Sequence, residues 1–411
     1  MILGGSRDRL SVWTYQRAGE EVAIGHPGVT DQERAAAGRA TLAELSRKLH
    51  VTNRRRAAKR FRKGLPGGEN LARVWRQRDP AELRERVNDG SPLAVWAEGD
   101  VLHVLWLGAA AEVYLTGGIQ PQMWQVEGTT DLWEASLRVR DLDHAVITVA
   151  ATPVFTPAGL AGTYAADEVV WRGPRARPMS PVASPPTGLI EAHHIDSRVL
   201  GERRGVTVYR PPGHDGVLPV CCLGDGGSVP MLARTIEPAI AHGRIPAMLL
   251  VGVHVGIDDE GSPPDADLRT REYIPGEDPQ RFDAHLDFVC DEVIPWARRE
   301  LDAAPARWIV GGYSNSAVWA IAAALRRPQV FGGVVALSPG IPPQDVGERP
   351  QVPHYLATGT LEAGFRLSTH LWSDRLRAGS VPHHLHEWTG GHDLYWWEQT
   401  LPDALAWLGK A

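Results

Sequence analysis

From about residue 189 onward, hydrophobic positions follow two spacings in turn. Short apolar runs such as AMLLVGVHVG and GGVVALSPG are typical of strands buried on both faces of a parallel sheet. Between such runs lie amphipathic stretches such as FDAHLDFVCDEVIPWARREL, which predicts one long helix. Strands that alternate with helices in this order favour a mostly parallel sheet covered on both faces. We therefore expect one α/β domain over residues 189–411.

The hydrophobic pattern is different over residues 91–171. The runs PLAVWAEGDVLHVLWLG, AEVYLTGG and ITVAATP are short and β-rich, and Gly, Asp and Asn turns separate them. This alternation predicts a small β-sandwich. Residues 172–188, RGPRARPMSPVASPPTG, carry too many prolines for a regular element and are expected to link the two domains.

Residues 1–90 are polar and rich in arginine. A helix is predicted to start near Thr30 and to run through RAAAGRATLAELSRKL, with a basic run from Arg54 to Lys63 after it. A helix-turn-helix that binds nucleic acid is one interpretation of this segment. A solvated helix pair packed on the next domain is favoured, because a short basic helix is a weak motif.

Composition narrows the classes of protein. The chain has 411 residues, more than one hydrophobic core usually spans, so two domains are expected. The net charge of −6 argues against a nucleic-acid partner. No stretch reaches the roughly 18 apolar residues of a membrane span, and the first residues lack the apolar run of a signal peptide. Three cysteines do not make a disulfide framework. These observations together favour a cytoplasmic location.

The segment WIVGGYSNSAVWAIAAAL carries the strongest chemical signal. An apolar strand runs into GYSNS and a helix begins at once, which is the arrangement of a nucleophile elbow with Ser314 exposed at the turn. The usual pattern is G-x-S-x-G, and here Ser316 replaces the second glycine. We expect its side chain to crowd the turn without blocking it, so that Ser316→Gly keeps or raises activity. An ordinary strand–helix turn with a serine cap is the alternative interpretation.

The partners of such a serine follow in the chain order Ser, acid, His. Glu362 comes directly after the strand PHYLATGT, and His392 lies in the loop TGGHD after the strand HHLHEW. His392 is the expected general base and Glu362 the acid that fixes its tautomer. Three other acids compete for that role, and Glu387 is the best of them. The other two are Asp374 and Asp393.

An oxyanion hole needs two backbone donors. The amide of Asn315 is expected to be one, and the loop that contains Gly226 and Gly227 is expected to supply the other. A phosphate-binding role for GDGG is disfavoured, because the lysine and spacing of a P-loop are absent.

No cofactor and no metal are expected. The histidine pairs His193-His194 and His383-His384 come with no carboxylate or cysteine set that would complete a metal site. Tryptophans gather near the C-terminus, and most of them are expected to lie in the core. Trp397 lies close to His392 in the sequence and is expected to border the pocket.

Over residues 91–411 the sequence resembles the enterochelin esterase-like members of the esterase D group of α/β-hydrolases. The resemblance rests on GYSNS with the helix and strand after it, on GTLE, on TGGHD with Trp397 beyond, and on LRTREYIPG. WQVEGTTDLWEASLRV is similar to the sandwich domain that precedes the hydrolase in such esterases. The resemblance implies that Ser314 is the nucleophile, Glu362 the acid and His392 the base. It implies a structural role for Arg269 and Glu272, as a pair near the mouth of the site.

The resemblance implies hydrolysis of an ester, most specifically in a ferric siderophore. An anionic siderophore calls for positive charge around the pocket. The candidates are Arg269, Arg271 and Arg366. The alternatives are a general acyl or carbohydrate esterase, or a non-catalytic binding protein on a hydrolase scaffold. The sequence does not indicate the oligomeric state or the role of residues 1–90.

Overall fold

A computed structural model describes most of the chain after residue 90 and short pieces before it. The described residues are 14–17, 20–23, 70–74, 78–87, 91–154, 168–256, 266–343 and 349–411. The helix expected from Thr30 and the basic run that follows it lie outside these residues. Near the N-terminus, strands β1 (Thr14–Arg17) and β2 (Glu20–Ala23) form an antiparallel pair.

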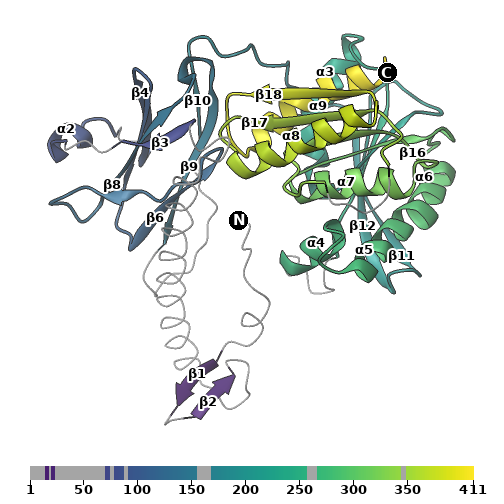
Figure 1. The fold of residues 1–411 in the computed structure, drawn as a ribbon, viewed down its shortest axis with the longest axis horizontal. Helices are drawn as coiled ribbons and strands as arrows, with labels where there is room; N and C mark the ends of the chain where they lie inside the picture. The colour runs from purple at the N-terminus through teal and green to yellow at the C-terminus, as the bar shows by residue number, and fades with distance from the viewer. Residues whose placement is uncertain are drawn as a thin grey trace.

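The C-terminal part of the chain is built on one eight-stranded sheet (Figure 1). From β14 to β18 all neighbours in the sheet are parallel, whereas β12 is antiparallel to both of its neighbours. The expected α/β-hydrolase fold is thereby confirmed. In spatial order the strands are β11 (Leu189–Ser197), β12 (Glu202–Arg210), β14 (Leu249–Val253), β13 (Val220–Leu223), β15 (Trp308–Tyr313), β16 (Phe331–Leu337), β17 (His354–Gly359) and β18 (His383–Trp388).

Helices cover both faces of this sheet, because its central strands are apolar on both sides. Helices α3 (Val229–Ala241) and α9 (Leu394–Leu408) pack together on one face. The other face carries α5 (Pro279–Asp287), α6 (Ile294–Glu300), α7 (Asn315–Arg326) and α8 (Ala363–Ala378). Helix α4 (Ala266–Tyr273) packs against α5 and α7. Among the described residues, no helix is both long and apolar enough to span a membrane.

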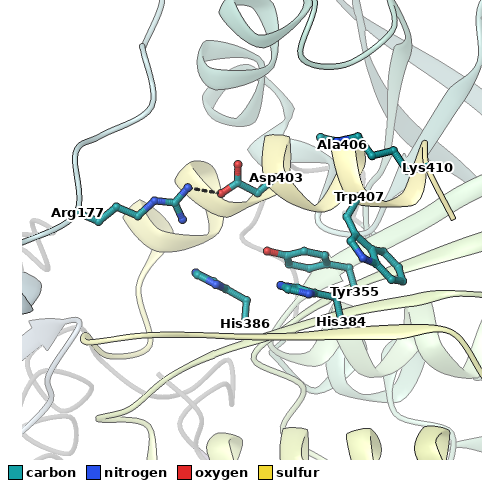
Figure 2. Close-up of a pocket in the computed structure, with 8 residues that line it drawn as sticks. All are labelled: Arg177, Tyr355, His384, His386, Asp403, Ala406, Trp407 and Lys410. Carbon is teal, nitrogen blue, oxygen red and sulfur yellow. Dashed lines mark hydrogen bonds and ion pairs between the residues drawn. The ribbon is translucent and has the colours of Figure 1, made fainter.

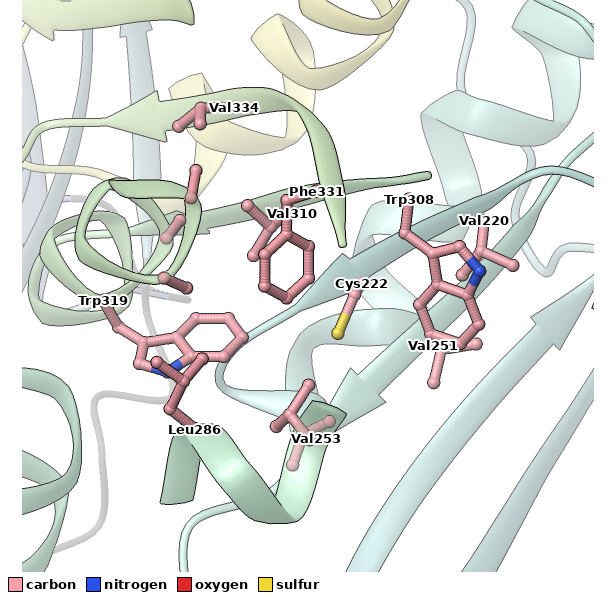
Figure 3. Close-up of a cluster of buried hydrophobic side chains, with 14 of the residues drawn as sticks. Val220, Cys222, Val251, Val253, Leu286, Trp308, Val310, Trp319, Phe331 and Val334 are labelled. Atoms are coloured by element: carbon pink, nitrogen blue, oxygen red, sulfur yellow. The ribbon is translucent and has the colours of Figure 1, made fainter. Parts of the chain in front are cut away.

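Strand period explains how the core divides between the two faces. Cys221 and Cys222 are adjacent and fully buried, yet they join different clusters, because successive side chains of a strand point to opposite faces. On the face of Cys222, large rings fill the space between sheet and helices, with Trp308 and Phe331 on strands and Trp319 on α7 (Figure 3). All three cysteines are free thiols.

The long helix expected over FDAHLDFVCDEVIPWARREL is interrupted. A π-helical turn at Phe288–Val293 separates α5 from α6. Pro295, in the first turn of α6, has no N–H for the hydrogen bond that a continuous α-helix would make there. The wider turn before the proline is one way in which a helix accommodates such a gap.

The expected sandwich is present before the hydrolase domain, and its two sheets share one core. The larger sheet has the order β3 (Leu71–Arg73), β8 (Leu132–Val139), β5 (Val101–Leu107) and β4 (Leu93–Glu98), with β7 (Trp124–Gln125) also paired to β8. The smaller sheet has the order β10 (Val169–Arg172), β9 (Val146–Val154) and β6 (Glu112–Gly117). Strand β3 and the short helix α2 (Pro80–Arg84) come from the region expected to form a separate arm, so the sandwich also uses residues before 91.

The sandwich is hydrogen-bonded to the loop between β18 and α9, which contains His392. The carbonyl of Gly118 accepts a hydrogen bond from the His392 amide at 3.2 Å. Three further bonds join Val146 N to Thr389 O at 3.0 Å, Trp396 Nε1 to Val146 O at 2.9 Å and Thr148 N to Asp393 Oδ2 at 3.1 Å. The packing is close, because a Cβ added to Gly391 would overlap the carbonyl of Gly118. Loop 389–393 is therefore positioned by both domains.

This close approach generates a stability prediction. We expect Gly391→Ala to lower the free energy of unfolding by about 1–3 kcal/mol or more, because backbone must move to admit the methyl group. Thermal unfolding measures the change. Gly276→Ala is the matched control, since a Cβ there meets nothing within 4 Å and its φ is not positive. Equal melting temperatures for the two variants would contradict the interdomain packing described above.

Candidate active site

Ser314 lies at a strained turn between β15 and α7. Its backbone has φ 55° and ψ −122°, in a region that costs a non-glycine residue on the order of 1–3 kcal/mol. The Ser314 amide donates to the carbonyl of Leu337 on the neighbouring strand at 2.9 Å, which helps to hold the turn. The sharp turn lifts the side chain to the carboxyl end of the sheet, as expected for a nucleophile elbow.

Two glycines allow the chain to pass so close to itself here. A Cβ at Gly312 would lie 2.5 Å from the backbone of Ser316, and a Cβ at Gly224 would lie 2.6 Å from the Ser316 Cβ. Neither position has room for a side chain. The turn therefore requires glycine both at Gly312, in the GYSNS motif, and at Gly224, directly after β13.

His392 and Glu362 are brought together from two different loops. The distance from His392 Nδ1 to Glu362 Oε2 is 2.8 Å. The other carboxylate oxygen of Glu362 accepts from Ser338 Oγ and from Gly359 N, each at 2.9 Å. With Nδ1–H donating to a buried carboxylate, the neutral imidazole keeps its Nε2 lone pair free to accept a proton. The expected acid and base thus lie within hydrogen-bonding distance of each other.

Aromatic rings surround the imidazole. Phe365, at the start of α8, stacks on it with ring centroids 4.0 Å apart, and Trp397 meets it edge-on at 4.7 Å. Trp397 is itself buried, stacks on Tyr313 at 4.3 Å and donates from Nε1 to Ser338 Oγ at 3.1 Å. Trp397 therefore lies beside the expected base and supports it from within the core.

Ser314 and His392 are not joined by a hydrogen bond among the described residues. The Ser314 side chain is nearly buried, at 5% exposure, and the imidazole is partly exposed, at 18%. Hydrogen bonds between a nucleophile and its base are often long before a substrate binds and shorten in the complex. The structure places the elbow serine and the His–Glu pair at the same edge of the sheet.

The three competing acids have other partners. Glu387 pairs with Arg366 at 2.5 Å and with His370 at 3.0 Å. Asp374 pairs with Arg377 on the exposed face of α8. Asp393 caps α9 through the amide of Tyr395 at 2.9 Å and accepts from the sandwich at Thr148 N. Burial raises the pKa of Asp393. Glu362 is thus the only one of the four acids bonded to the imidazole of His392.

The loop after β13 approaches the elbow from the other side. A short 3₁₀ turn, Gly226–Ser228, follows Asp225 and leads into α3. Within the described part of the chain, the amides of Gly226, Gly227 and Asn315 have no acceptor. A Cβ at Gly226 would collide with the carbonyl of Gly252 on β14, which fixes how close this turn lies to the sheet. These amides remain the candidates for an oxyanion hole.

Ser316 is enclosed within the turn and is hydrogen-bonded there. Its side chain is fully buried, and its hydroxyl accepts from the Tyr313 amide at 3.0 Å and lies 2.7 Å from Asp225 Oδ2. The space that a second glycine would leave is occupied by a hydroxyl with bonded neighbours. The sequence alone does not indicate these hydrogen bonds.

Each of the three arginines expected to attract an anionic substrate lies in an ion pair. Arg269 binds Asp225 through two hydrogen bonds, of 2.7 and 2.6 Å. Arg271 pairs with Asp278 at 2.7 Å, and Arg366 pairs with Glu387. Glu272, the other residue of the Arg-x-x-Glu element, does not bind Arg269. It pairs with the buried Arg204 and with Arg281 instead.

The histidines considered as metal ligands lie on β11 and β18. In the parts of the chain that the structure describes, no cluster of three or more His, Cys, Asp or Glu side chains is placed to bind a metal ion. His384 and His386 line a surface hollow of about 320 Å³ together with Tyr355 and Trp407 (Figure 2). The ion-paired Arg177 and Asp403 also line this hollow, which shares no residue with the Ser314 site.

Several residues around the site are not among the candidates selected from the sequence. Ser338 bonds Glu362, Phe365 stacks on His392, and Asp225 contacts Ser316. Ser338 and Asp225 do each follow an apolar strand, as Ser314 does, and the ends of parallel strands are where sites of this fold gather. Tyr273 accepts from the Asp225 amide at 2.8 Å and lies on α4, where nothing in the sequence indicates this contact.

Comparison with known proteins indicates the class of enzyme. Residues 197–372 match the family model described as "Putative esterase". The chain has the α/β-hydrolase fold, and the matched part supports an enzyme of the esterase class. Both findings support a hydrolase that acts on esters, and the resemblance to enterochelin esterases is confirmed in the fold. Comparison with curated protein sequences gives no match.

The esterase shares its fold with solved bacterial enzymes at low sequence identity. The enterobactin esterase from Shigella flexneri, solved in the presence of 2,3-di-hydroxy-N-benzoyl-glycine, has a TM-score of 0.60 and 15% identity, covering 81% of this chain and 99% of that chain. The ferric enterobactin esterase from Salmonella typhimurium has a TM-score of 0.59 and 16% identity, with 81% and 99% covered. Such coverage exceeds the length of residues 189–411, so the similarity extends into the sandwich.

The two glutamates give a direct test of the site. Glu362→Gln keeps the shape of the side chain but removes the charge that stabilises a protonated His392, so we expect kcat to fall about a hundredfold or more. Glu387→Gln is the matched control, because its carboxylate binds Arg366 and His370 rather than His392. Steady-state kinetics on a short-chain aryl ester measures both variants. A larger loss for Glu387→Gln would contradict the assignment of the acid.

Proposed function

We propose that this esterase works by a Ser-His-Glu triad, with Ser314 as nucleophile, His392 as general base and Glu362 as the acid behind it. The observation that carries the proposal is the strained serine at the strand–helix turn together with a His–Glu pair closed at 2.8 Å. A buried serine with a left-handed backbone is costly, and such strain concentrates at functional sites. An ordinary capped turn has no need of it.

The first half of the proposed reaction forms an acyl-enzyme. Ser314 Oγ attacks the ester carbonyl carbon as His392 Nε2 takes its proton, and the carbonyl oxygen becomes an oxyanion. Collapse of the tetrahedral intermediate breaks the bond to the alcohol oxygen. The imidazolium returns its proton to that oxygen, and the alcohol leaves. Glu362 stabilises the imidazolium through the bond to Nδ1–H.

The second half repeats these steps with water. His392 takes a proton from the water as it attacks the acyl carbon. Collapse of the second tetrahedral intermediate breaks the bond to Ser314 Oγ, the imidazolium of His392 returns its proton to that oxygen, and the carboxylic acid leaves. The free amides of Asn315 and of Gly226 or Gly227 would bind the oxyanion in both halves. Losing one donor of this kind costs roughly 10²–10³ in kcat in other enzymes.

Removing the nucleophile tests the mechanism. We expect Ser314→Ala to keep its melting temperature within a few degrees and to lose at least about 10⁴-fold in kcat, because nucleophile and base act as a unit. A fluorophosphonate probe should label the wild type at Ser314 and leave the variant unlabelled, as peptide mapping will show. Ser373→Ala, which alters a buried serine on α8, is the control that should label normally. Undiminished hydrolysis by Ser314→Ala would overturn the proposed triad.

For the substrate we propose an ester of a siderophore, presented as its ferric complex. Support comes from the fold, which matches enterobactin esterases across both domains. Another structure of the Shigella flexneri enzyme was solved in the presence of enterobactin. A cytoplasmic location would suit such a role and remains a prediction from the sequence.

The paired arginines change how an anionic substrate would be recognised. Arg269, Arg271 and Arg366 each have a carboxylate partner, so none of them adds a net positive charge to the site. Recognition by these three side chains is therefore not part of the proposal. The rings of Phe365 and Trp397 lie against the imidazole of His392, and Tyr313 stacks on Trp397. These rings, rather than the arginines, would shape the substrate pocket.

A general acyl or carbohydrate esterase is the alternative. The observation that favours it is the same set of ion pairs, which leaves no uncompensated arginine among those expected to attract an anion. In that case the sandwich would hold the sugar.

A substrate comparison distinguishes the two. We expect kcat/KM for a ferric catecholate trilactone to exceed that for an acetylated sugar by at least about tenfold, which corresponds to roughly 1.4 kcal/mol of barrier. Release of the linear trimer and of acetate, followed by chromatography, measures the two rates. The iron-free trilactone tests whether the metal complex itself is preferred. Good turnover of acyl sugars beside none of any trilactone would favour the alternative.

A further inference from the structure

Ser316 and Asp225 meet at the boundary between the nucleophile turn and the loop after β13. Ser316 is in the first turn of α7, two residues after Ser314, and it is completely buried. Its hydroxyl lies 2.7 Å from Asp225 Oδ2 and 2.8 Å from the carbonyl of Tyr313. The hydroxyl has one proton, and the charged carboxylate is the stronger acceptor. Ser316 therefore donates to Asp225 and accepts from the Tyr313 amide.

Asp225 is held in an unusual backbone conformation. Its φ and ψ are both 55°, and its amide donates to the hydroxyl of Tyr273 at 2.8 Å. Left-handed backbone costs a non-glycine residue roughly 1–2 kcal/mol, so its surroundings must hold it there. Gly226 and Gly227 follow directly, so the position of Asp225 sets the position of their amides.

Arg269 completes the arrangement from α4. Its Nε and Nη2 donate to the two oxygens of Asp225, at 2.7 and 2.6 Å. Burial disfavours the charged guanidinium, but the hydrogen bonds to Asp225 more than offset this, so the pKa of Arg269 lies above its ordinary value. The carboxylate of Asp225 is thus fixed by one side chain from α4 and one from α7.

We propose that Ser316 is a positioning residue. Through the carboxylate of Asp225 it fixes the oxyanion loop, residues 225–227 after β13, relative to Ser314. The proposal rests on the triad proposed above, because it assigns the loop amides to the oxyanion hole of that mechanism. Glycine at this position would leave the two segments in contact but without a directional bond. The hydroxyl supplies that bond, with one end on the nucleophile turn and the other on the loop.

The test begins with removal of the hydroxyl alone. Ser316→Ala keeps the Cβ, and we expect kcat on a short-chain aryl ester to fall about ten- to a hundredfold, part of what is lost with a whole oxyanion donor. KM should change by less than about twofold, because ground-state binding does not use the oxyanion hole. Ser316→Gly should lose a similar amount. A role in folding alone would lower the melting temperature and leave the kcat of the folded enzyme unchanged.

The route through Asp225 is tested by a double-mutant cycle. Asp225→Asn keeps the size of the side chain and tolerates the left-handed backbone, but it removes the charged acceptor. If Ser316 acts through Asp225, the double variant should be no slower than Asp225→Asn alone, because the two changes remove one interaction. Additive losses in kcat would overturn this route. The matched control is Ser373→Ala. Its buried hydroxyl has no hydrogen-bond partner among the described residues, and its loss should leave kcat unchanged.

The outcomes separate this inference from the mechanism on which it rests. An active wild type, an inactive Ser314→Ala and a Ser316→Ala variant with normal kcat would overturn the positioning role and leave the triad intact. Retained or raised activity in Ser316→Gly would do the same. Undiminished hydrolysis by Ser314→Ala would instead overturn the triad, and the positioning role with it.

Discussion

The site is organised around the left-handed backbone of Ser314. A residue with φ 55° between a strand and a helix is stable only where neighbouring segments come very close. Gly312 and Gly224 provide that closeness, since neither has room for a Cβ. The bond from the Ser314 amide to Leu337 ties the turn to the next strand. The strand order brings the loops after β13, β17 and β18 to the same edge of the sheet, so the turn meets them there.

The second organising constraint is that loop 389–393, which contains His392, is held in place by both domains. His392 receives its orientation from Glu362 on one side, and its backbone is held by the carbonyl of Gly118 on the other. Asp393 extends the same contact, because it caps α9 while it accepts from Thr148 of the sandwich. The sandwich is thus more than an appended module. It forms part of the support of the residue that moves the proton in the proposed mechanism.

The sequence predicts well those features that depend on local pattern. Apolar runs and helical spacing locate the strands of the sheet and the helices that cover it. Ser314, Glu362 and His392 can be selected as candidates because each lies just after a predicted strand. Features that depend on contacts between distant segments escape it. Nothing local shows that Glu272 pairs with Arg204 rather than with Arg269, or that Leu71–Arg73 joins the sandwich. Hydrophobic periodicity shows which face of a helix is apolar, but it does not show how each turn is hydrogen-bonded. It therefore predicts a continuous helix through Pro295 and misses the π-helical turn.

Charge compensation around the oxyanion loop explains why Arg269 pairs where it does. In the proposed mechanism a negative charge develops beside the amides of Gly226 and Gly227, directly after the carboxylate of Asp225. An unpaired carboxylate there would oppose the oxyanion, and more strongly so where water is scarce. The two hydrogen bonds from Arg269 neutralise Asp225 while leaving it able to accept from Ser316. In that mechanism Arg269 would favour the oxyanion by cancelling a neighbouring negative charge. The same ion pair leaves Arg269 without a net charge that could attract an anionic substrate from solution.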